Sequence, residues 1–436
     1  MLKIVVIGAG HGGLQAAKVL ADRGYDVTVF ERERKDKLSR DRWDTIEPAV
    51  FEDLNIPLPE GTFKDAACAF TAPFSNKPLI IDLPEEKRDW TVDRRLLAIQ
   101  LADSAEKEGA KIYYETPVEK LIFDNTGVIG VIVAGEKIYT DLVIDASGVF
   151  SPFRRSLPKR FGITSDPEPD DVFYTWDAMF TETDGIDAPK DYNFLMHLKY
   201  NGEKCIAWCV PEFEDKYAAF IGKAGGLSDE DFDRLNGKLR NDYPWLGTKL
   251  IRGGDRAEIP IRYPLTKMVA QGYAAVGDSA FMTVPLLGVG VANSLRAGQM
   301  LADAIKDADS VSINTLWDYQ VRYYNEIGSG SFFIEKLKRA LLNSDNDLLL
   351  SFFEGGIISN EELKSLINGK ITLISVRDLI SRIKKAYEVK HLFGNLMRAA
   401  LSGYSAMKAA SSIPKKYDPL KIAGWKQKID KIMEQK

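Results

Sequence analysis

The chain opens with short apolar runs separated by glycine-rich and polar segments. An almost wholly apolar run at 3–7 is followed by a glycine-rich stretch at 8–13, and residues 14–20 have the apolar spacing of a helix. A second apolar run at 26–30 follows a Gly-Tyr turn. Because both runs are apolar on both faces, we predict two buried parallel strands joined by a helix.

Strands and one long amphipathic helix continue this first part of the chain. The helix is expected over 96–108, since Gly109 follows it as a C-terminal cap. Between about 65 and 92, two short strands around a proline-rich loop form an excursion. Further strands are expected at 111–115, 127–133, 136–139 and 141–145.

The pattern changes twice more. Between 166 and 255 it favours an antiparallel sheet, with strands at 172–181, 192–200, 203–211 and 216–221. After about 310 it is helical throughout. We therefore predict an α/β protein with three parts: a Rossmann-like three-layer domain built from 1–165 and 256–310, an inserted antiparallel β-sheet domain at 166–255, and a helical C-terminal region at 311–436.

The glycines of the first loop have the spacing of a dinucleotide site. Gly8 suits a tight turn, Gly10 lets the backbone approach a pyrophosphate, and Gly13 lets the helix pack closely on the strand. Phosphate charge would then lie on the free N–H groups at the helix N-terminus. Strand, loop, helix and second strand in register favour this interpretation over an unrelated glycine turn.

The second strand ends in an acid. Glu31 is placed to accept hydrogen bonds from both ribose hydroxyls of an adenosine. Arg32 beside it is also a candidate cofactor-binding residue. An arginine here can pair with a 2′-phosphate, but the acid at the strand end argues against that role.

Composition limits the chemistry. The chain has 436 residues, 45% of them hydrophobic, a formal net charge of -5, three cysteines and three histidines. These values indicate an ordinary globular protein of two or three domains, with no nucleic-acid partner, metal cluster or disulfide framework expected. No apolar stretch approaches twenty residues, so we expect a cytoplasmic protein whose chemistry comes from a bound cofactor.

Two further segments carry a family resemblance. Arg94 is followed by Leu97 and Gly109 at spacings of three and fifteen, and a strand at 273–280 ends in Gly277-Asp278. The latter precedes a loop that contains Pro285, Gly288 and Gly290. In this order the pieces resemble the FAD-dependent oxidoreductases that include aromatic hydroxylases, flavin-dependent halogenases and geranylgeranyl reductases.

The resemblance implies FAD as the cofactor. It implies that Arg94 contacts the flavin, and that Asp278, after Gly277, hydrogen-bonds the ribityl chain. The loop of Pro285, Gly288 and Gly290, with the N-terminus of the following helix, would face the pyrimidine end of the flavin. Free N–H groups there would stabilise negative charge on a reduced flavin.

One departure separates this chain from the aromatic hydroxylases. Ser147 stands where those proteins carry the Asp of an Asp-Gly pair, although Ser151 and Arg154 fit the pattern. The resemblance is therefore nearest to the geranylgeranyl reductase-like and halogenase branches. Ile206-Ala-Trp208-Cys-Val-Pro211 resembles a strand motif of both. Trp208 is a candidate apolar wall for a substrate over the flavin, the alternative being a tryptophan of the core.

The residues that would distinguish a halogenase from a prenyl reductase are either doubtful or absent in this chain. Lys64 is the one candidate for the lysine that a halogenase needs, and a solvated surface lysine is the expected alternative. Arg42 to Thr45 stand where prenyl reductases often carry a Cys-Gly pair. Cys205 and Cys209 share one strand face, opposite to that of Trp208, and are expected to be buried apolar residues.

The C-terminal region is basic. From Ile371 on it holds fourteen Lys or Arg against five Asp or Glu. An amphipathic patch that touches anionic lipid is one interpretation, and a solvated helical face packed on the flavin domain is the other. The basic residues Lys384, Lys385, Lys390, Arg398, Lys408, Lys415 and Lys416 alternate with Leu392, Phe393, Leu396, Met397 and Met407.

We therefore expect an FAD-dependent oxidoreductase in which the flavin itself is the reactive group. The favoured hypothesis is reduction of a carbon–carbon double bond in an apolar, prenyl-like or lipid-like substrate. A monooxygenase or halogenase acting through a C4a-hydroperoxyflavin is the alternative, and a flavin-binding protein without turnover is a third. No second dinucleotide motif is visible, so electrons are expected from transient NAD(P)H binding, a flavin reductase or a ferredoxin.

Overall fold

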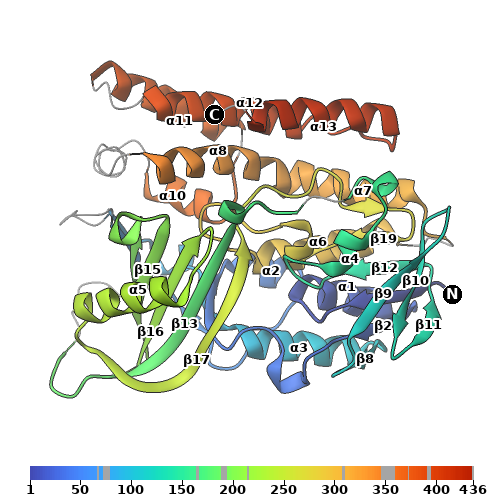
Figure 1. Ribbon diagram of the computed structural model, residues 1–436, viewed down its shortest axis with the longest axis horizontal. Helices are drawn as coiled ribbons and strands as arrows, with labels where there is room; N and C mark the ends of the chain where they lie inside the picture. Colours follow the sequence, from blue (N-terminus) through green and yellow to red (C-terminus); the bar gives the residue numbers. More distant parts are fainter. Residues whose placement is uncertain are drawn as a thin grey trace.

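The computed structural model describes residues 1–65, 68–71, 79–163, 166–187, 194–213, 216–306, 310–344, 359–371, 373–389 and 394–434. Figure 1 shows the sheet that contains β1, β2 and β12 with its helices on one side, a second sheet beside them, and a layer of C-terminal helices over both. None of the described helices combines the length and the apolar character needed to cross a bilayer.

The central sheet has six strands in the order β18-β19-β12-β1-β2-β8. All pairs are parallel except β18–β19, and β12 at its centre is fully buried, as the apolar runs predict. The helix α1 packs against α3 and α6. The bounds are β1 Lys3–Ile7, α1 His11–Asp22, β2 Asp26–Phe30, α3 Arg94–Lys107, β8 Lys111–Tyr113, β12 Leu142–Asp145, β18 Val269–Ala270, β19 Tyr273–Ala275 and α6 Val291–Ala304.

Two three-stranded sheets flank this core. In one, β9 (Val118–Phe123), β10 (Val128–Val133) and β11 (Glu136–Tyr139) form an antiparallel layer, and its first strand was not predicted. In the other, β7 (Trp90–Asp93) pairs with β3 (Trp43–Ile46) and with β4 at residues 63–64. Ile46 ends a strand, and the helix α2 (Pro48–Asp53) begins at Pro48, where proline is favoured because an N–H in the first turn would have no partner within the helix.

The second large sheet has seven strands in the order β17-β13-β16-β15-β14-β5-β6. Residues 166–255 supply the predicted strands and an unpredicted helix, α5, on one face. The excursion of the first part of the chain joins this sheet, because β5 pairs in parallel with β14. The strand β17 also runs across the predicted boundary at 255. The bounds are β5 Cys68–Thr71, β6 Leu79–Ile81, β13 Val172–Glu182, β14 Phe194–Leu198, β15 Cys205–Phe213, β16 Lys216–Ala224, α5 Asp229–Asp242 and β17 Leu246–Pro260.

The remaining described chain is helical, as expected. One long helix runs through α7, a π-helical turn at Tyr324–Gly328 and α8, and Figure 1 shows α11, α12 and α13 as an outer layer over it. Of the residues expected in a basic patch, Leu396 and Met407 are buried, since α12 packs on α8. Lys390, Leu392, Phe393 and the side chain of Lys385 lie outside the described residues. The bounds are α7 Ile313–Tyr323, α8 Ser329–Asn343, α10 Asn360–Ile367, α11 Leu373–Val389, α12 Gly394–Ala410 and α13 Pro419–Glu434.

Candidate functional site

The glycine loop after β1 is shaped by close contacts with the end of β12. Gly8 has φ +89°, and a Cβ placed there would lie 2.8 Å from the carbonyl oxygen of Ala146. A Cβ at Gly13 would lie 2.7 Å from the Ala146 Cβ, and one at Gly10 would lie 3.2 Å from the Ala146 oxygen. Gly10 precedes α1 without any side-chain cap, so the first N–H groups of the helix are free to bind a ligand.

Glu31 supports this loop from the end of β2. One carboxylate oxygen accepts a hydrogen bond from the N–H of Ala9 at 2.5 Å, and the other accepts from the N–H of Glu33 at 2.8 Å. The Glu31 side chain is buried beside the loop. Arg32 instead lies on the surface, where its Nε is 3.4 Å from a Glu33 oxygen.

The second motif of the sequence meets the first at the N-terminus of α1. A Cβ at Gly12 would lie 2.6 Å from the carbonyl oxygen of Ser294 in α6 and 3.0 Å from Val276, the residue before Gly277. Gly277 has φ +70° and begins the turn that carries Asp278. The glycine loop at 8–13 and the turn at 276–278, more than 260 residues apart in the sequence, therefore lie together, and we call this pair of segments the cradle.

Asp278 is half-buried, and its carboxylate accepts no hydrogen bond from the described residues. Burial raises the pKa of its carboxyl, while the positive charges of Arg94 and Arg40 oppose that shift. Arg94 is held by Ser39 Oγ at 3.0 Å and by Asp44 Oδ2 at 3.2 Å. A half-open carboxylate thus faces two cations.

Arg40 was not singled out in the sequence, although the density of charges between 33 and 44 indicates a loop over the nucleotide site. Its Nη2 donates to the carbonyl oxygen of Glu258 at 2.9 Å, which ties this loop to β17. Burial and the nearby Arg94 lower the pKa of Arg40 to about 10, so it stays cationic at neutral pH.

His11 begins α1 and is also buried. Its Nε2 has no hydrogen-bond partner in the described part of the chain. Burial, with a smaller contribution from the Arg94 charge, lowers the pKa of His11 to about 3. The imidazole is therefore neutral at neutral pH and adds no charge to the cradle.

The loop before α6 is a compact turn. The N–H of Gly288 donates to the Val284 carbonyl oxygen at 2.9 Å, and the N–H of Val284 donates to the Val289 oxygen at 2.7 Å. A Cβ at Gly288 would lie 2.6 Å from Ile259 Cγ2, and one at Gly290 would lie 2.7 Å from Thr283 Cγ2. Pro285 is buried beneath the turn.

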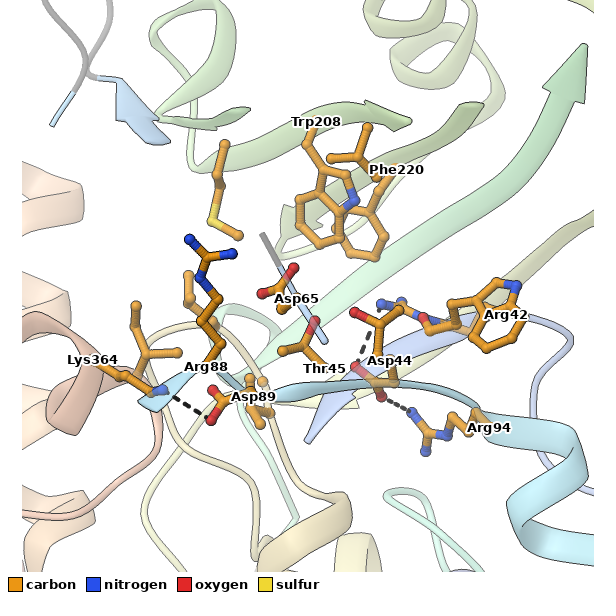
Figure 2. A pocket seen from close by; sticks show the side chains of 18 of the residues that line it. Arg42, Asp44, Thr45, Asp65, Arg88, Asp89, Arg94, Trp208, Phe220 and Lys364 are labelled. Carbon is orange, nitrogen blue, oxygen red and sulfur yellow. Dashed lines mark hydrogen bonds and ion pairs between the residues drawn. The ribbon is translucent and has the colours of Figure 1, made fainter. Parts of the chain in front are cut away.

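A cavity of about 410 Å³ lies between this loop and the seven-stranded sheet (Figure 2). Its apolar lining includes Trp208, whose ring stacks on that of Phe220 with centroids 3.8 Å apart and planes within 5°. Leu287, Gly288 and Val289 of the loop also line it. Trp208 is half-buried: it packs against two apolar clusters and also lines the cavity.

Cys205 and Cys209 lie on the other face of that sheet, as expected. Both are buried in the cluster that packs against α5. Burial raises the pKa of the Cys209 thiol to about 12. Neither thiol is in a position to act on a ligand in the cavity.

Comparisons with known proteins agree with this geometry. Residues 85–184 match the family of FAD-dependent oxidoreductases, and residues 3–42 match the pyridine nucleotide-disulphide oxidoreductases. A digeranylgeranylglycerophospholipid reductase of Sulfolobus acidocaldarius is 24% identical over 453 residues, which cover 99% of this chain and 97% of that protein. The reductase of the same description from Haloferax volcanii is 27% identical over 322 residues, covering 69% of this chain and 74% of that protein.

Solved structures show the same fold. A geranylgeranyl bacteriochlorophyll reductase-like protein of Thermoplasma acidophilum has a TM-score of 0.72 at 19% identity, covering 90% of this chain and 99% of that one. The chain is thus similar, in sequence and in fold, to geranylgeranyl reductase-like proteins among the FAD-dependent oxidoreductases. A flavin-dependent brominase has a lower TM-score of 0.64 at 16% identity, with 89% of this chain and 99% of that one covered.

The residues of this oxidoreductase fit FAD. Three glycines leave room for a pyrophosphate, the first turn of α1 offers free N–H groups, and Asp278 presents a carboxylate with no hydrogen-bond donor among the described residues. Reduced FAD supplies a hydride when bound. The protein supplies the cradle, the charges around Asp278 and the apolar cavity.

The structure also brings together residues that the sequence did not. Lys64, Asp65, Arg88, Asp89 and Lys364 also line the cavity, and Figure 2 shows Arg88, Asp89 and Lys364 on the side away from Arg94. Lys64, for which a solvated surface position was the expected alternative, is half-buried: its ammonium lies 3.9 Å from the centroid of the Trp90 ring, and the residue lines the cavity. No sequence signal links the other four, since they come from segments separated by up to three hundred residues.

Proposed function

We propose that this oxidoreductase reduces carbon–carbon double bonds in the prenyl chain of a lipid. Two relatives that resemble it over most of the chain are named as reductases of digeranylgeranylglycerophospholipid. In such a reaction one carbon of the double bond accepts a hydride and the other a proton. The observation that carries the proposal is the apolar cavity that runs from Trp208 to the loop at Leu287–Val289.

The site residues have distinct proposed roles. The glycine loop approaches the pyrophosphate of FAD, the adenosine end lies at Glu31 and Arg32, and the ribityl chain and flavin lie between Asp278, Arg94 and the loop before α6. Trp208 forms the wall against which the prenyl chain packs. The proposed cofactor-binding residues are Gly8, Gly10, Gly13, Glu31, Arg32, Arg94, Gly277, Asp278, Pro285, Gly288 and Gly290.

We also propose that the cofactor and the substrate are bound by different parts of the chain, as predicted. Residues 1–165 and 256–310 form the FAD-binding domain, and 166–255 cover the substrate. The C-terminal region contributes to the cavity, because Lys364 and Ile367 of α10 line it. The participation of β5 and β6 in the substrate sheet supports a cover built from both parts of the chain.

The direct test is product analysis. Protein reduced anaerobically with dithionite is mixed with a digeranylgeranyl glycerophospholipid, and the product is examined by mass spectrometry. The expected result is a gain of two hydrogens for each double bond reduced. A product that appears only in air and carries added oxygen, or halogen when halide is present, would instead establish the monooxygenase or halogenase alternative.

The halogenase alternative rests on Lys64, the lysine that lines the cavity. Replacing Lys64 by methionine would abolish halide incorporation if this lysine formed the halogenating species. A reductase would keep its hydrogen transfer in the same variant, although its affinity for substrate could change. Halide incorporation and hydrogen transfer, both measured on one preparation of the variant, therefore distinguish a halogenase from a reductase.

Trp208→Ala is expected to lower kcat/KM for the prenyl substrate by about a hundredfold, because the apolar wall and its stack on Phe220 are lost. Steady-state kinetics under anaerobic conditions measure this change. Cys209→Ala is the matched control, since Cys209 follows Trp208 in β15 but faces α5. Equal losses in both variants would contradict a substrate-facing role for Trp208.

Electron supply and membrane contact complete the proposal. We propose that NAD(P)H, a flavin reductase or a ferredoxin reduces the flavin.

Membrane contact is proposed for α12, α13 and their connection. Leu401 and Leu420 are 49% and 87% exposed there, and Lys408, Lys415 and Lys416 are also exposed. A basic surface with exposed leucines would bind the headgroups of an anionic bilayer.

Leu420→Glu is expected to weaken sedimentation with vesicles that contain anionic lipid, because it adds a negative charge and removes an apolar contact. Co-sedimentation with neutral vesicles is the control for charge dependence. If the unaltered protein fails to sediment with anionic vesicles, the proposed contact is refuted.

A further inference from the structure

A row of alternating charges connects the cradle to the wall of the cavity. It is formed by β3 and the loop before it, by the start of α3, by β13 of the seven-stranded sheet and by the turn of the cradle. Charges near a bound flavin change how readily it accepts electrons, so the balance within this row matters. Three cations and three anions face one another in it, namely Arg40, Arg42, Arg94, Asp44, Asp177 and Asp278.

Asp44 is the shared partner of two of these arginines. Its Oδ2 lies 3.2 Å from Arg94 Nη1, and its Oδ1 lies 3.7 Å from Arg42 Nη2. Figure 2 shows the carboxylate between the two guanidinium groups, and all three residues line the cavity. The side chains of Asp44 and Arg94 are 19% and 20% exposed, so bulk water screens their charges less than it does on an open surface.

The two arginines differ in what else holds them. Arg42 has a second carboxylate, because its Nη1 lies 3.8 Å from Asp177 Oδ2. Arg94 instead donates its Nε to the hydroxyl of Ser39 at 3.0 Å, which is a neutral group. Within the described part of the chain, Asp44 is the carboxylate in ion-pair contact with Arg94. Asp44 therefore determines how much of the Arg94 charge is compensated.

We propose that Asp44 is a positioning residue that sets the reduction potential of the flavin through Arg94. The ion pair fixes the guanidinium and cancels much of its positive charge. Positive charge beside a flavin favours the reduced, negatively charged form, so a compensated Arg94 keeps the potential low. A flavin of low potential is the stronger hydride donor. The inference rests on the proposed position of the flavin beside Arg94, and it does not depend on which substrate is reduced.

The test measures the two-electron reduction potential of the FAD-loaded protein without substrate. The protein is reduced slowly under anaerobic conditions with a reference dye, and the absorbances of flavin and dye are followed together. Asp44→Asn keeps the shape of the side chain and removes its charge. We expect the equilibrium constant for reduction to rise about tenfold, which corresponds to about 30 mV. Asp44→Glu keeps the charge and is expected to stay within about twofold of the unaltered protein.

Ser39 allows a test of the opposite sign. Its φ is +57°, a left-handed conformation that Asp and Asn adopt more readily than most residues, so either can replace it with little strain. Ser39→Asp would place a second carboxylate beside Arg94 Nε, and it is expected to lower the equilibrium constant about tenfold. Ser39→Asn is the matched neutral control and is expected to change the constant by less than about twofold.

Asp41→Asn controls for the general loss of a negative charge from this loop. Asp41 lies 3.1 Å from Arg95 Nη1, accepts a hydrogen bond from Arg252 Nε at 2.7 Å, and is not among the residues that line the cavity. An equal shift in Asp41→Asn and Asp44→Asn, or no shift in Asp44→Asn, would overturn the role of Asp44. If Asp44→Asn fails to retain FAD, an unchanged constant in Ser39→Asp overturns it instead.

A double variant separates the role of Asp44 from the position of the flavin. Arg94→Gln is expected to lower the equilibrium constant, and Asp44→Asn is expected to add little in that background. An Asp44 effect that persists without Arg94 would overturn the action through Arg94. An Arg94→Gln protein that binds FAD at an unchanged potential would overturn both the proposed flavin position and the role of Asp44. A protein that shows all the expected shifts but reduces no double bond would refute the proposed reaction and leave the role of Asp44 in place.

Discussion

Gly8→Ala is expected to lower the affinity of the protein for FAD by on the order of a hundredfold, equivalent to about 2.7 kcal/mol. The added Cβ would lie 2.8 Å from the carbonyl oxygen of Ala146 and 3.3 Å from the Cα of Ser147, both backbone atoms at the end of the central strand β12. Backbone atoms cannot rotate away, so the glycine loop itself must move. Its N–H groups would then lose their alignment with the pyrophosphate.

A second contribution comes from the backbone conformation. Gly8 has φ +89°, and a residue with a Cβ adopts that region at a cost of about 1–2 kcal/mol. The measurement is fluorescence titration of the apoprotein with FAD, supported by the flavin content of protein as purified. A Gly8→Ala protein that purifies yellow, with an unchanged dissociation constant, would refute the proposed role of this loop.

Gly24→Ala separates the two effects. Gly24 has φ +80°, but a Cβ there would meet no atom within 4 Å. This variant is expected to lose about 1 kcal/mol of stability through backbone strain and to keep its affinity for FAD. The difference between the two variants therefore measures the contact with β12.

Glu335→Ala is expected to lower the free energy of unfolding by about 3–5 kcal/mol. Glu335 lies in α8 with a fully buried side chain, 3.0 Å from the Lys338 ammonium and 2.5 Å from the Arg339 Nε. Lys338 is itself only 3% exposed and also donates to the carbonyl oxygen of Ile261. Removal of the carboxylate leaves a buried ammonium without a counter-charge.

Chemical denaturation of the FAD-loaded protein measures this loss. Glu326→Ala is the control on the same long helix, since its pair with Arg322 is exposed and is expected to contribute about 0.3–0.5 kcal/mol. The double variant Glu335→Ala with Lys338→Met is expected to recover most of the stability, because the unpaired charge is removed. If the double variant is no more stable than Glu335→Ala alone, buried charge is not the cause.

The Glu335 network also connects the C-terminal helices to the cavity. Lys338 reaches the carbonyl of Ile261, two residues after Ile259, which lines the cavity. Arg339 and Arg262 both pair with Asp171 at the start of β13. The C-terminal region is thereby fixed to the seven-stranded sheet by charges as well as by apolar packing.

Some expectations from the sequence depended on surroundings that the sequence does not reveal. The spacing of Leu396 and Met407 predicts an apolar helical face, yet the same spacing suits either a bilayer or another helix. In the structure α12 packs on α8, and both side chains are buried. Lys64 is a similar case, since a lysine in a polar stretch is normally solvated, whereas here β4 places it over Trp90.

The sequence by itself determined the first β-α-β unit, its glycine loop and the acid at its end. These features depend on contacts within about thirty residues and on backbone conformations that few residues other than glycine adopt, so local composition specifies them. The alternation of Trp208 with Cys209 likewise specified that the two side chains lie on opposite faces of the sheet, because neighbouring residues of a strand point to opposite faces.

Only the tertiary structure decided how distant segments combine. Apolar alternation marks β5 as a strand, but its parallel partner β14 begins more than 120 residues later, and pairing at that distance depends on the folded topology. The charged side of the cavity away from Arg94 has the same origin. Lys364 of α10 meets Lys87 and Asp89 just before β7, and no pattern along the chain encodes that meeting.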